Sequence, residues 1–345
     1  MALAWGTPTA SRRRALGADA NGRRGRAASE GAALLPLAPR SLAVNMAQAL
    51  AEDGVTVWTD GYWWSNDGLR LHYRDYPGDD AGKPPIICIP GLTRNARDWE
   101  GVAERLAGDW RVIAVDLRGR GESAYAKDPM TYVPLTYLQD LEALVRELAL
   151  ERLVLFGTSL GGLLSMLLGA AEKNRVVGML VNDIGPELDD SGVSRIRSYV
   201  GRPATWPTWV HAARDLQEAH SACYPDWTLD DWLVFAKRVA RLNNSGRMVF
   251  DYDMRIAEPF KLPVTTGLDL WSAFGALKNI PMTVVRGETS DILSAATLAR
   301  MAAEHPDLET VTVPRVGHAP TLDEPIVQEA IGRLLGRVEE RLAVA

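Results

Sequence analysis

Short, uninterrupted runs of apolar residues alternate with helical patterns along most of the chain. Such runs are typical of strands that are buried on both faces of a mainly parallel sheet. The expected strands lie at residues 86–89, 112–115, 153–156, 176–181, 282–285 and 311–313. Amphipathic patterns between them predict crossover helices at residues 96–106, 135–150, 160–171, 295–303 and 325–342. The sequence therefore predicts an α/β fold with a doubly wound, mainly parallel sheet.

Two segments depart from this alternation. Near the start, β-rich runs at residues 62–64 and 69–76 flank the turn triplet Asn66-Asp67-Gly68, which predicts an opening hairpin. Later, helical patterns without a convincing parallel strand occupy residues 194–200, 209–220 and 230–242. We interpret residues 187–270 as a helical cap inserted into an α/β core of residues 46–186 and 271–345.

Residues 1–45 show no helical or strand periodicity and carry seven arginines against two acidic residues. A segment of this composition buries too little apolar surface to offset the entropy of ordering, so we expect disorder. An arginine-rich start is also compatible with an export or transit signal, although no apolar region follows the arginines. A further interpretation is that translation begins at Met46 and that residues 1–45 are a mis-annotated extension.

Charge and composition exclude several classes of protein. Removing the +5 of residues 1–45 from the net charge of −6 leaves −11 on the rest of the chain. Because phosphate binding needs clustered Lys and Arg, we expect no nucleic-acid partner. The two cysteines, Cys88 and Cys223, give neither a disulfide framework nor a zinc site, and they favour a reducing, cytoplasmic location. No apolar stretch approaches the roughly 18 residues of a membrane span, so we expect a soluble protein of undefined oligomeric state.

One strand–turn–helix motif carries the clearest chemical signal. The apolar run at residues 153–156 leads into Gly157-Thr158-Ser159-Leu160-Gly161, and a helix of small residues follows. A serine on so sharp a turn needs glycines beside it, because larger side chains would collide there. The amino end of the following helix favours negative charge that develops near the serine. We therefore predict Ser159 as a nucleophile.

A serine hydroxyl needs a base, and the base needs an orienting carboxylate. Of the five histidines, only His318 follows a late sheet strand. Asp291 follows the strand expected at residues 282–285 and gives the chain order Ser, Asp, His, which is that of α/β-hydrolases. Asp183, at the exit of the strand expected at residues 176–181, is the alternative acid. We predict His318 as general base and Asp291 as the orienting acid.

Acyl transfer also needs two backbone N–H groups that bind the oxyanion of the intermediate. Leu160 follows the nucleophile directly and supplies the first. Leu92 lies in Pro90-Gly91-Leu92-Thr93, after the strand expected at residues 86–89, where Gly91 permits close approach of the backbone. We predict that the amides of Leu160 and Leu92 form the oxyanion hole.

From about Trp58 to Leu342 the chain resembles the α/β-hydrolase superfamily. Besides the serine motif, residues 116–123 resemble the family's loop after the fourth sheet strand, and residues 317–320 resemble its histidine loop. Pro90 is a departure, because many members have histidine before the oxyanion glycine. Ser159 disfavours haloalkane dehalogenases and epoxide hydrolases, whose nucleophile is an aspartate. The motifs are most similar to those of esterases, enol-lactonases and hydrolases that cleave carbon–carbon bonds.

The resemblance implies two-step acyl transfer through an acyl-enzyme, with water as the final acceptor and with no metal or organic cofactor. The aromatic residues of the expected cap favour a small hydrophobic ester or lactone as substrate, although we expect more than half of these rings to form the cap's own core. Three alternatives remain open: hydrolysis of carbon–carbon bonds in aromatic ring-fission products, acyl transfer to an acceptor other than water, and a non-catalytic small-molecule binding protein on the same fold.

Overall fold

The computed structural model describes residues 58–79, 82–261 and 269–344. The predicted N-terminal extension, residues 1–45, lies outside the described residues. Residues 46–57 of the predicted core and residues 262–268 of the predicted cap also lie outside them.

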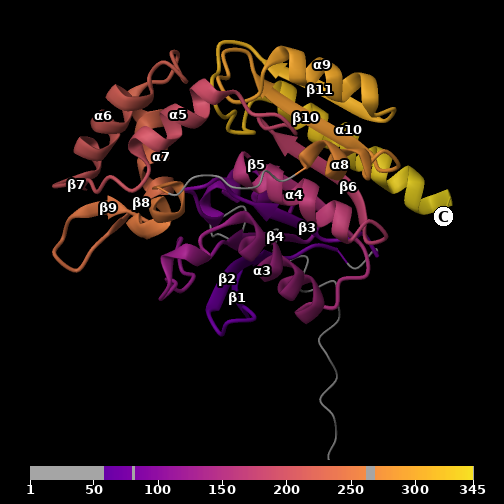
Figure 1. Cartoon of the computed structure of the whole chain (residues 1–345), viewed down its shortest axis with the longest axis horizontal. Helices are drawn as coiled ribbons and strands as arrows, with labels where there is room; N and C mark the ends of the chain where they lie inside the picture. The colour runs from indigo at the N-terminus through magenta and orange to yellow at the C-terminus, as the bar shows by residue number, and fades with distance from the viewer. Residues whose placement is uncertain (1–57, 80–81, 262–268, 345) are drawn as a thin grey trace, which may run out of the picture. The chain divides into compact units, whose positions relative to one another are not determined.

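An eight-stranded sheet forms the centre of the fold (Figure 1), with the order β1-β2-β4-β3-β5-β6-β10-β11. Strand β2 is antiparallel to both of its neighbours, β1 and β4, whereas the remaining neighbours run parallel. The mainly parallel sheet and the opening hairpin that the sequence predicted are thus confirmed. The strands are β1 (Thr59–Trp64), β2 (Arg70–Tyr76), β3 (Ile86–Ile89), β4 (Val112–Asp116), β5 (Leu153–Thr158), β6 (Val176–Asn182), β10 (Met282–Gly287) and β11 (Leu308–Val313).

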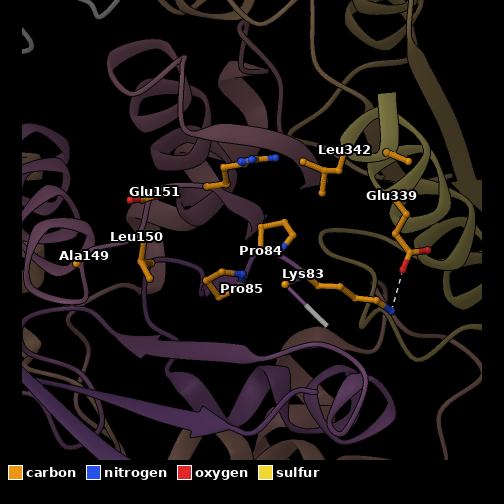
Figure 2. A pocket seen from close by; sticks show the side chains of 11 residues that line it. Lys83, Pro84, Pro85, Ala149, Leu150, Glu151, Glu339 and Leu342 are labelled. Carbon is orange, nitrogen blue, oxygen red and sulfur yellow. Dashed lines mark ion pairs between the residues drawn. The ribbon is translucent and has the colours of Figure 1, made fainter. Parts of the chain in front are cut away.

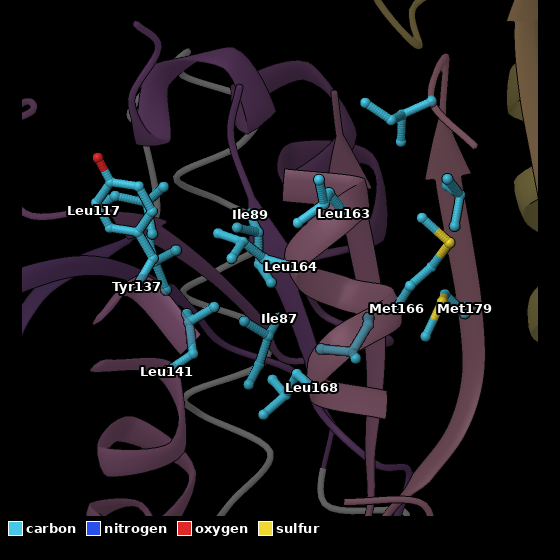
Figure 3. Close-up of a cluster of buried hydrophobic side chains, with 14 of the residues drawn as sticks. Ile87, Ile89, Leu117, Tyr137, Leu141, Leu163, Leu164, Met166, Leu168 and Met179 are labelled. Carbon is cyan, nitrogen blue, oxygen red and sulfur yellow. The ribbon is translucent and has the colours of Figure 1, made fainter. Parts of the chain in front are cut away.

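Helices cover both faces of the sheet because successive side chains of each strand point to opposite faces. In β3, Ile87 and Ile89 belong to a core cluster that also holds residues of α3, α4, α8 and α9, whereas Ile86 and Cys88 belong to a cluster with residues of α2 and α10. Figure 3 shows the first cluster, where side chains of α4 lie beside Ile87 and Ile89. Full burial of one such aliphatic side chain contributes roughly 1.5–3 kcal/mol. The helices are α2 (Glu100–Leu106), α3 (Pro134–Glu147), α4 (Leu160–Ala171), α8 (Leu270–Gly275), α9 (Ala295–Glu304) and α10 (Pro325–Val344).

Between β6 and β10, residues 190–261 form a group of elements that we call the insertion. Residues 206–248 of the insertion hold a core cluster of their own, whereas Ile196 and Ile256 pack with the first cluster of the sheet. The sequence predicted a helix over residues 230–242, but α7 ends at Val239 because residue 240 has an extended backbone and residues 240–242 pair with β9. The elements are α5 (Asp190–Tyr199), β7 (Thr205–Trp206), α6 (Trp209–His220), α7 (Leu229–Val239), β8 (Ala240–Leu242), β9 (Met248–Phe250) and the 3₁₀ helix η3 (Met254–Lys261), with β7, β9 and β8 in an antiparallel sheet.

Hydrogen bonds join the insertion to loops at the carboxyl ends of the sheet strands. On one side, Asn95 Nδ2 donates to the carbonyl oxygen of Arg238 at 3.0 Å, and Arg97 Nη2 lies 2.7 Å from Asp251 Oδ2. On the other side, the N–H of Gly317 donates to the carbonyl oxygen of Cys223 at 2.8 Å. The insertion therefore contacts both the loop that follows β3 and the loop that follows β11.

Candidate functional site

Ser159 occupies the sharp turn between β5 and α4. Its φ of +53° and ψ of −117° are unusual for a residue with a side chain, a strain on the order of 1–3 kcal/mol that the surroundings must hold in place. Its N–H donates to the carbonyl oxygen of Asn182 at 2.9 Å. A Cβ on Gly157 would collide with the backbone of Gly161, and a Cβ on Gly161 would collide with the carbonyl oxygen of Ile89. The turn thus needs both glycines of the sequence motif.

His318 lies between Ser159 and a buried carboxylate. Its Nε2 is 2.9 Å from Ser159 Oγ, and its Nδ1 is 2.8 Å from Oδ2 of Asp183. The side chain of Asp183 is fully buried, and it also accepts hydrogen bonds from the N–H of Gly287 at 2.9 Å and from Ser290 Oγ at 2.7 Å. These bonds fix the carboxylate, and the carboxylate in turn fixes the imidazole ring.

Asp291, which the sequence analysis predicted as the partner of His318, is held elsewhere. Its carboxylate accepts hydrogen bonds from Nε and Nη2 of Arg195, on α5, at 2.5 and 2.8 Å. This bonding to Arg195 lowers the pKa of Asp291. The structure therefore corrects the prediction, because Asp183, the alternative acid, takes the place beside His318 and Asp291 instead pairs with the insertion.

The two predicted oxyanion-hole residues lie close to Ser159 in the chain or in space: Leu160 begins α4 directly after it, and a Cβ on Gly91, the neighbour of Leu92, would lie 3.8 Å from Ser159 Cβ. Among the residues that the structure describes, neither the N–H of Leu92 nor that of Leu160 has an acceptor. The Leu92 loop is held by Arg120, a fully buried residue whose Nε and Nη2 donate to the Leu92 carbonyl oxygen at 2.9 and 2.7 Å. Arg120 belongs to the family-like loop at residues 116–123, for which no role of this arginine was predicted. The arginine's place in that loop was the only signal in the sequence, because its burial depends on the fold.

The insertion holds the histidine loop from the other side. The hydroxyl of Tyr224 donates to the carbonyl oxygen of Ala319 at 2.7 Å, and the ring of Tyr224 stacks on Trp227 with centroids 3.9 Å apart. Sequence reasoning placed both aromatics in the cap but had no means of assigning this contact, because it joins residues 95 positions apart.

Two cavities of the described chain are lined by residues other than Ser159 and His318. One of about 690 Å³ (Figure 2) is lined by residues such as Pro85 and Arg152, which precede β3 and β5, and it carries the Lys83–Glu339 ion pair of 2.8 Å. It therefore lies at the amino ends of these strands, away from Ser159 at the carboxyl end of β5. A cavity of about 220 Å³ is lined by His72, Asp60 and Asp116 among others.

Neither a metal centre nor a membrane-crossing helix is found in the part of the chain that the structure describes. No group of three or more His, Cys, Asp or Glu side chains there is arranged to bind a metal ion. None of the described helices is both long and apolar enough to cross a membrane. A serine hydroxyl bonded to an oriented imidazole is suited to nucleophilic attack on a carbonyl carbon.

Comparison with known proteins gives a consistent family. The sequence profile described as the alpha/beta hydrolase family matches residues 86–329. The chain is 36% identical to a 3-hydroxybutyrate-oligomer hydrolase of Cupriavidus necator over 264 residues, which is 74% of this chain and 89% of the relative. It is 30% identical to a 2-(acetamidomethylene)succinate hydrolase of Mesorhizobium japonicum over 68% of this chain and 81% of the relative.

A solved structure supports the same assignment. The crystal structure of an alpha/beta hydrolase from Novosphingobium aromaticivorans is 58% identical and superimposes with a TM-score of 0.79, covering 82% of this chain and 100% of that one. The fold predicted from the motifs is therefore confirmed. The chain belongs to the alpha/beta hydrolase family and is a hydrolytic enzyme.

Proposed function

We propose that this hydrolase cleaves carboxylic esters, with Ser159 as nucleophile, His318 as general base and Asp183 as the acid that orients the histidine. The observation that carries the proposal is the continuous chain of hydrogen bonds from Ser159 Oγ through the imidazole to Asp183 Oδ2, at 2.9 and 2.8 Å. Both distances are within the range required for proton transfer from the serine.

The proposed reaction has two steps. Ser159 Oγ attacks the ester carbonyl carbon while its proton moves to His318 Nε2, and the tetrahedral oxyanion accepts hydrogen bonds from the amides of Leu92 and Leu160. His318 then gives the proton to the departing alcohol, and the acyl group remains on Ser159. Water then attacks the acyl carbon while His318 takes its proton, and His318 returns the proton to Ser159 Oγ as the bond to the serine breaks and the acid leaves. The buried carboxylate of Asp183 stabilises the imidazolium in each step.

The substrate class is proposed from the relatives and from the insertion. An oligomer of 3-hydroxybutyrate, named in the 36% identical relative, is a chain of carboxylic esters with one free carboxylate. Most aromatic rings of the insertion lie in its own core or pack against it, and Trp206, Trp232 and Phe235 are buried there. The aromatic composition therefore gives little support to an aromatic substrate, and we propose short esters of hydroxy acids instead.

Labelling and turnover test this proposal together. Wild type and Ser159→Ala are treated with a fluorophosphonate probe and assayed with p-nitrophenyl butyrate and with the linear dimer of 3-hydroxybutyrate. We expect labelling and hydrolysis in the wild type only. Folded wild type that is neither labelled nor active would contradict the proposal and favour a binding protein.

A further inference from the structure

Arg94 lies beside Ser159, on the loop that follows β3. Its N–H donates to the carbonyl oxygen of Gly91 at 3.2 Å, which closes a turn over residues 91–94. A Cβ on Gly91 would lie 3.4 Å from Arg94 Cγ and 3.8 Å from Ser159 Cβ. The side chains of Arg94 and Ser159 therefore border the same small space.

The guanidinium of Arg94 is held between the core and the insertion. It lies 4.4 Å from the ring centroid of Phe235, on α7, and its Nη2 donates to Asp98 Oδ1 at 2.5 Å. The side chain is only 23% exposed, and its Nε–H is a buried donor that has no acceptor among the described residues. Buried donors are nearly always bonded in proteins, so this one is suited to an acceptor supplied by a ligand.

The charges of Arg94 and Arg195 both act on one partly buried histidine of the insertion, His220. His220 packs between Tyr199 and Phe235, with ring centroids 5.8 and 6.3 Å away. Burial, and then the charges of Arg94 and Arg195, lower the pKa of His220 to about 4, so that the imidazole is neutral at pH 7. Arg195 already has a bidentate carboxylate partner in Asp291, whereas Arg94 donates to Asp98 through Nη2 alone among the described residues. Arg94 is therefore a cation near Ser159 that has hydrogen-bonding capacity left for a ligand.

We propose that Arg94 binds a free carboxylate of the substrate and makes the enzyme selective for anionic esters of hydroxy acids over neutral ones. A planar guanidinium offers several N–H donors to a carboxylate, and a partly desolvated pair of this kind is strong and directional. The inference rests on the proposed ester hydrolysis at Ser159. It adds a specificity-determining residue and a required charge on the substrate.

The test compares two substrates that differ only in charge: the linear dimer of 3-hydroxybutyrate and the same dimer with its terminal carboxylate converted to the carboxamide. We expect wild type to prefer the acid in kcat/KM, and we expect Arg94→Gln to reduce the acid-to-amide ratio at least tenfold. Arg94→Lys should retain part of the preference. The matched control is Arg333→Gln, on α10, where the arginine is 52% exposed and pairs with Glu309. This control should keep the wild-type ratio.

Parallel losses on both substrates in Arg94→Gln would overturn the inference, because a residue that only joins the loop to the insertion affects them equally. A wild type without preference for the acid would also overturn it. If the Arg94 variants fail to fold, inhibition of the wild type decides: 3-hydroxybutyrate should inhibit hydrolysis of p-nitrophenyl butyrate at least tenfold more strongly than 3-hydroxybutyramide. Equal inhibition by the two would contradict the inference.

The two proposals fail in different ways. If p-nitrophenyl butyrate is hydrolysed only when Ser159 is present, but the acid dimer is not preferred, the proposed ester hydrolysis is supported. The proposed role of Arg94 is then contradicted. Absence of both labelling and hydrolysis would contradict the proposed ester hydrolysis, and the inference about Arg94 would fail with it.

Discussion

Oδ2 of Asp183 lies 2.8 Å from Nδ1 of His318, although 135 positions separate the two residues in the sequence. Asp183 follows β6 and His318 follows β11, and β10 lies between these two strands in the sheet. The end of β10 and the loop after it contribute to the same contact, because the N–H of Gly287 and the hydroxyl of Ser290 both donate to the Asp183 carboxylate. The ends of three neighbouring strands thus position the Asp183 carboxylate beside His318.

Replacement of the acid tests this arrangement directly. Asp183→Asn keeps the size of the side chain but removes the charge that orients and stabilises the imidazolium. We expect kcat for p-nitrophenyl butyrate to fall by about 10³- to 10⁴-fold, as in serine hydrolases that lose this carboxylate. Steady-state kinetics on folded protein, checked by circular dichroism, measure the loss.

Asp291→Asn is the matched control. Its ion pair with Arg195 is about one-third exposed on each side, and an exposed pair is worth little, so we expect kcat to change by less than about tenfold. A larger loss in Asp291→Asn than in Asp183→Asn would restore the acid first predicted from the sequence.

The choice between these two aspartates shows where sequence reasoning stops. The apolar runs predicted the parallel sheet, and the glycine spacing predicted a tight turn at Ser159, because both depend on neighbours in the chain. Asp183 and Asp291 were both expected at strand exits, and β6 and β10 are paired neighbours, so topology alone does not separate them. The deciding contact is Arg195 with Asp291, which depends on how the insertion packs and leaves no periodic signal. The contacts of Arg94 with Phe235 and of Tyr224 with Ala319 likewise depend on how the insertion packs, so no sequence pattern predicts them.

Gly161 offers a test of the turn itself. An added methyl group would collide with the Ile89 carbonyl oxygen, and backbone cannot move aside as a flexible side chain does. We expect Gly161→Ala to lower the free energy of unfolding by roughly 1–3 kcal/mol and to reduce activity, because β3 and α4 must separate. Urea denaturation measures the first effect and ester hydrolysis the second.

Gly332, in the middle of α10, provides the opposite expectation. A Cβ there meets no atom within 4 Å. We therefore expect Gly332→Ala to raise the free energy of unfolding by roughly 0.5–1 kcal/mol, because the unfolded chain loses entropy. Equal free energies of unfolding for Gly161→Ala and Gly332→Ala would contradict the close contact between Gly161 and the Ile89 carbonyl oxygen.

His72 predicts a dependence of stability on pH. The buried imidazole lies 2.7 Å from both Asp116 Oδ2 and Asp60 Oδ1. Burial opposes protonation, but the hydrogen bonds to Asp116 and Asp60 outweigh it and raise the pKa of His72. Because the folded protein then holds the proton more tightly than the unfolded chain, the stabilisation is complete below about pH 6.5 and is lost as pH rises through the folded pKa.

We therefore expect His72→Gln to lower the free energy of unfolding by roughly 1–3 kcal/mol at pH 6, because two charge-assisted hydrogen bonds are lost. The difference from wild type should shrink at pH 9, where a neutral imidazole donates only one of them. Denaturation at the two pH values, with the exposed His211→Gln as control, provides the measurement. A difference that grows with pH would refute the charged state of His72.

Tyr224 links the insertion to the histidine loop through one hydrogen bond. Its hydroxyl donates to the carbonyl oxygen of Ala319, the residue after His318, while its ring remains stacked on Trp227. Tyr224→Phe keeps the stacked ring and removes only this bond. Since one such bond is worth roughly 0.5–1.5 kcal/mol, we expect a loosened histidine loop and a fall in kcat of about threefold to tenfold.

Tyr252→Phe is the comparison, because its hydroxyl accepts from Gly201 and does not contact the histidine loop. A fall in kcat confined to Tyr224→Phe, at similar thermal stability of the two variants, would identify Tyr224 as a positioning residue. Equal kcat in both variants would mean that the core alone holds His318 in place.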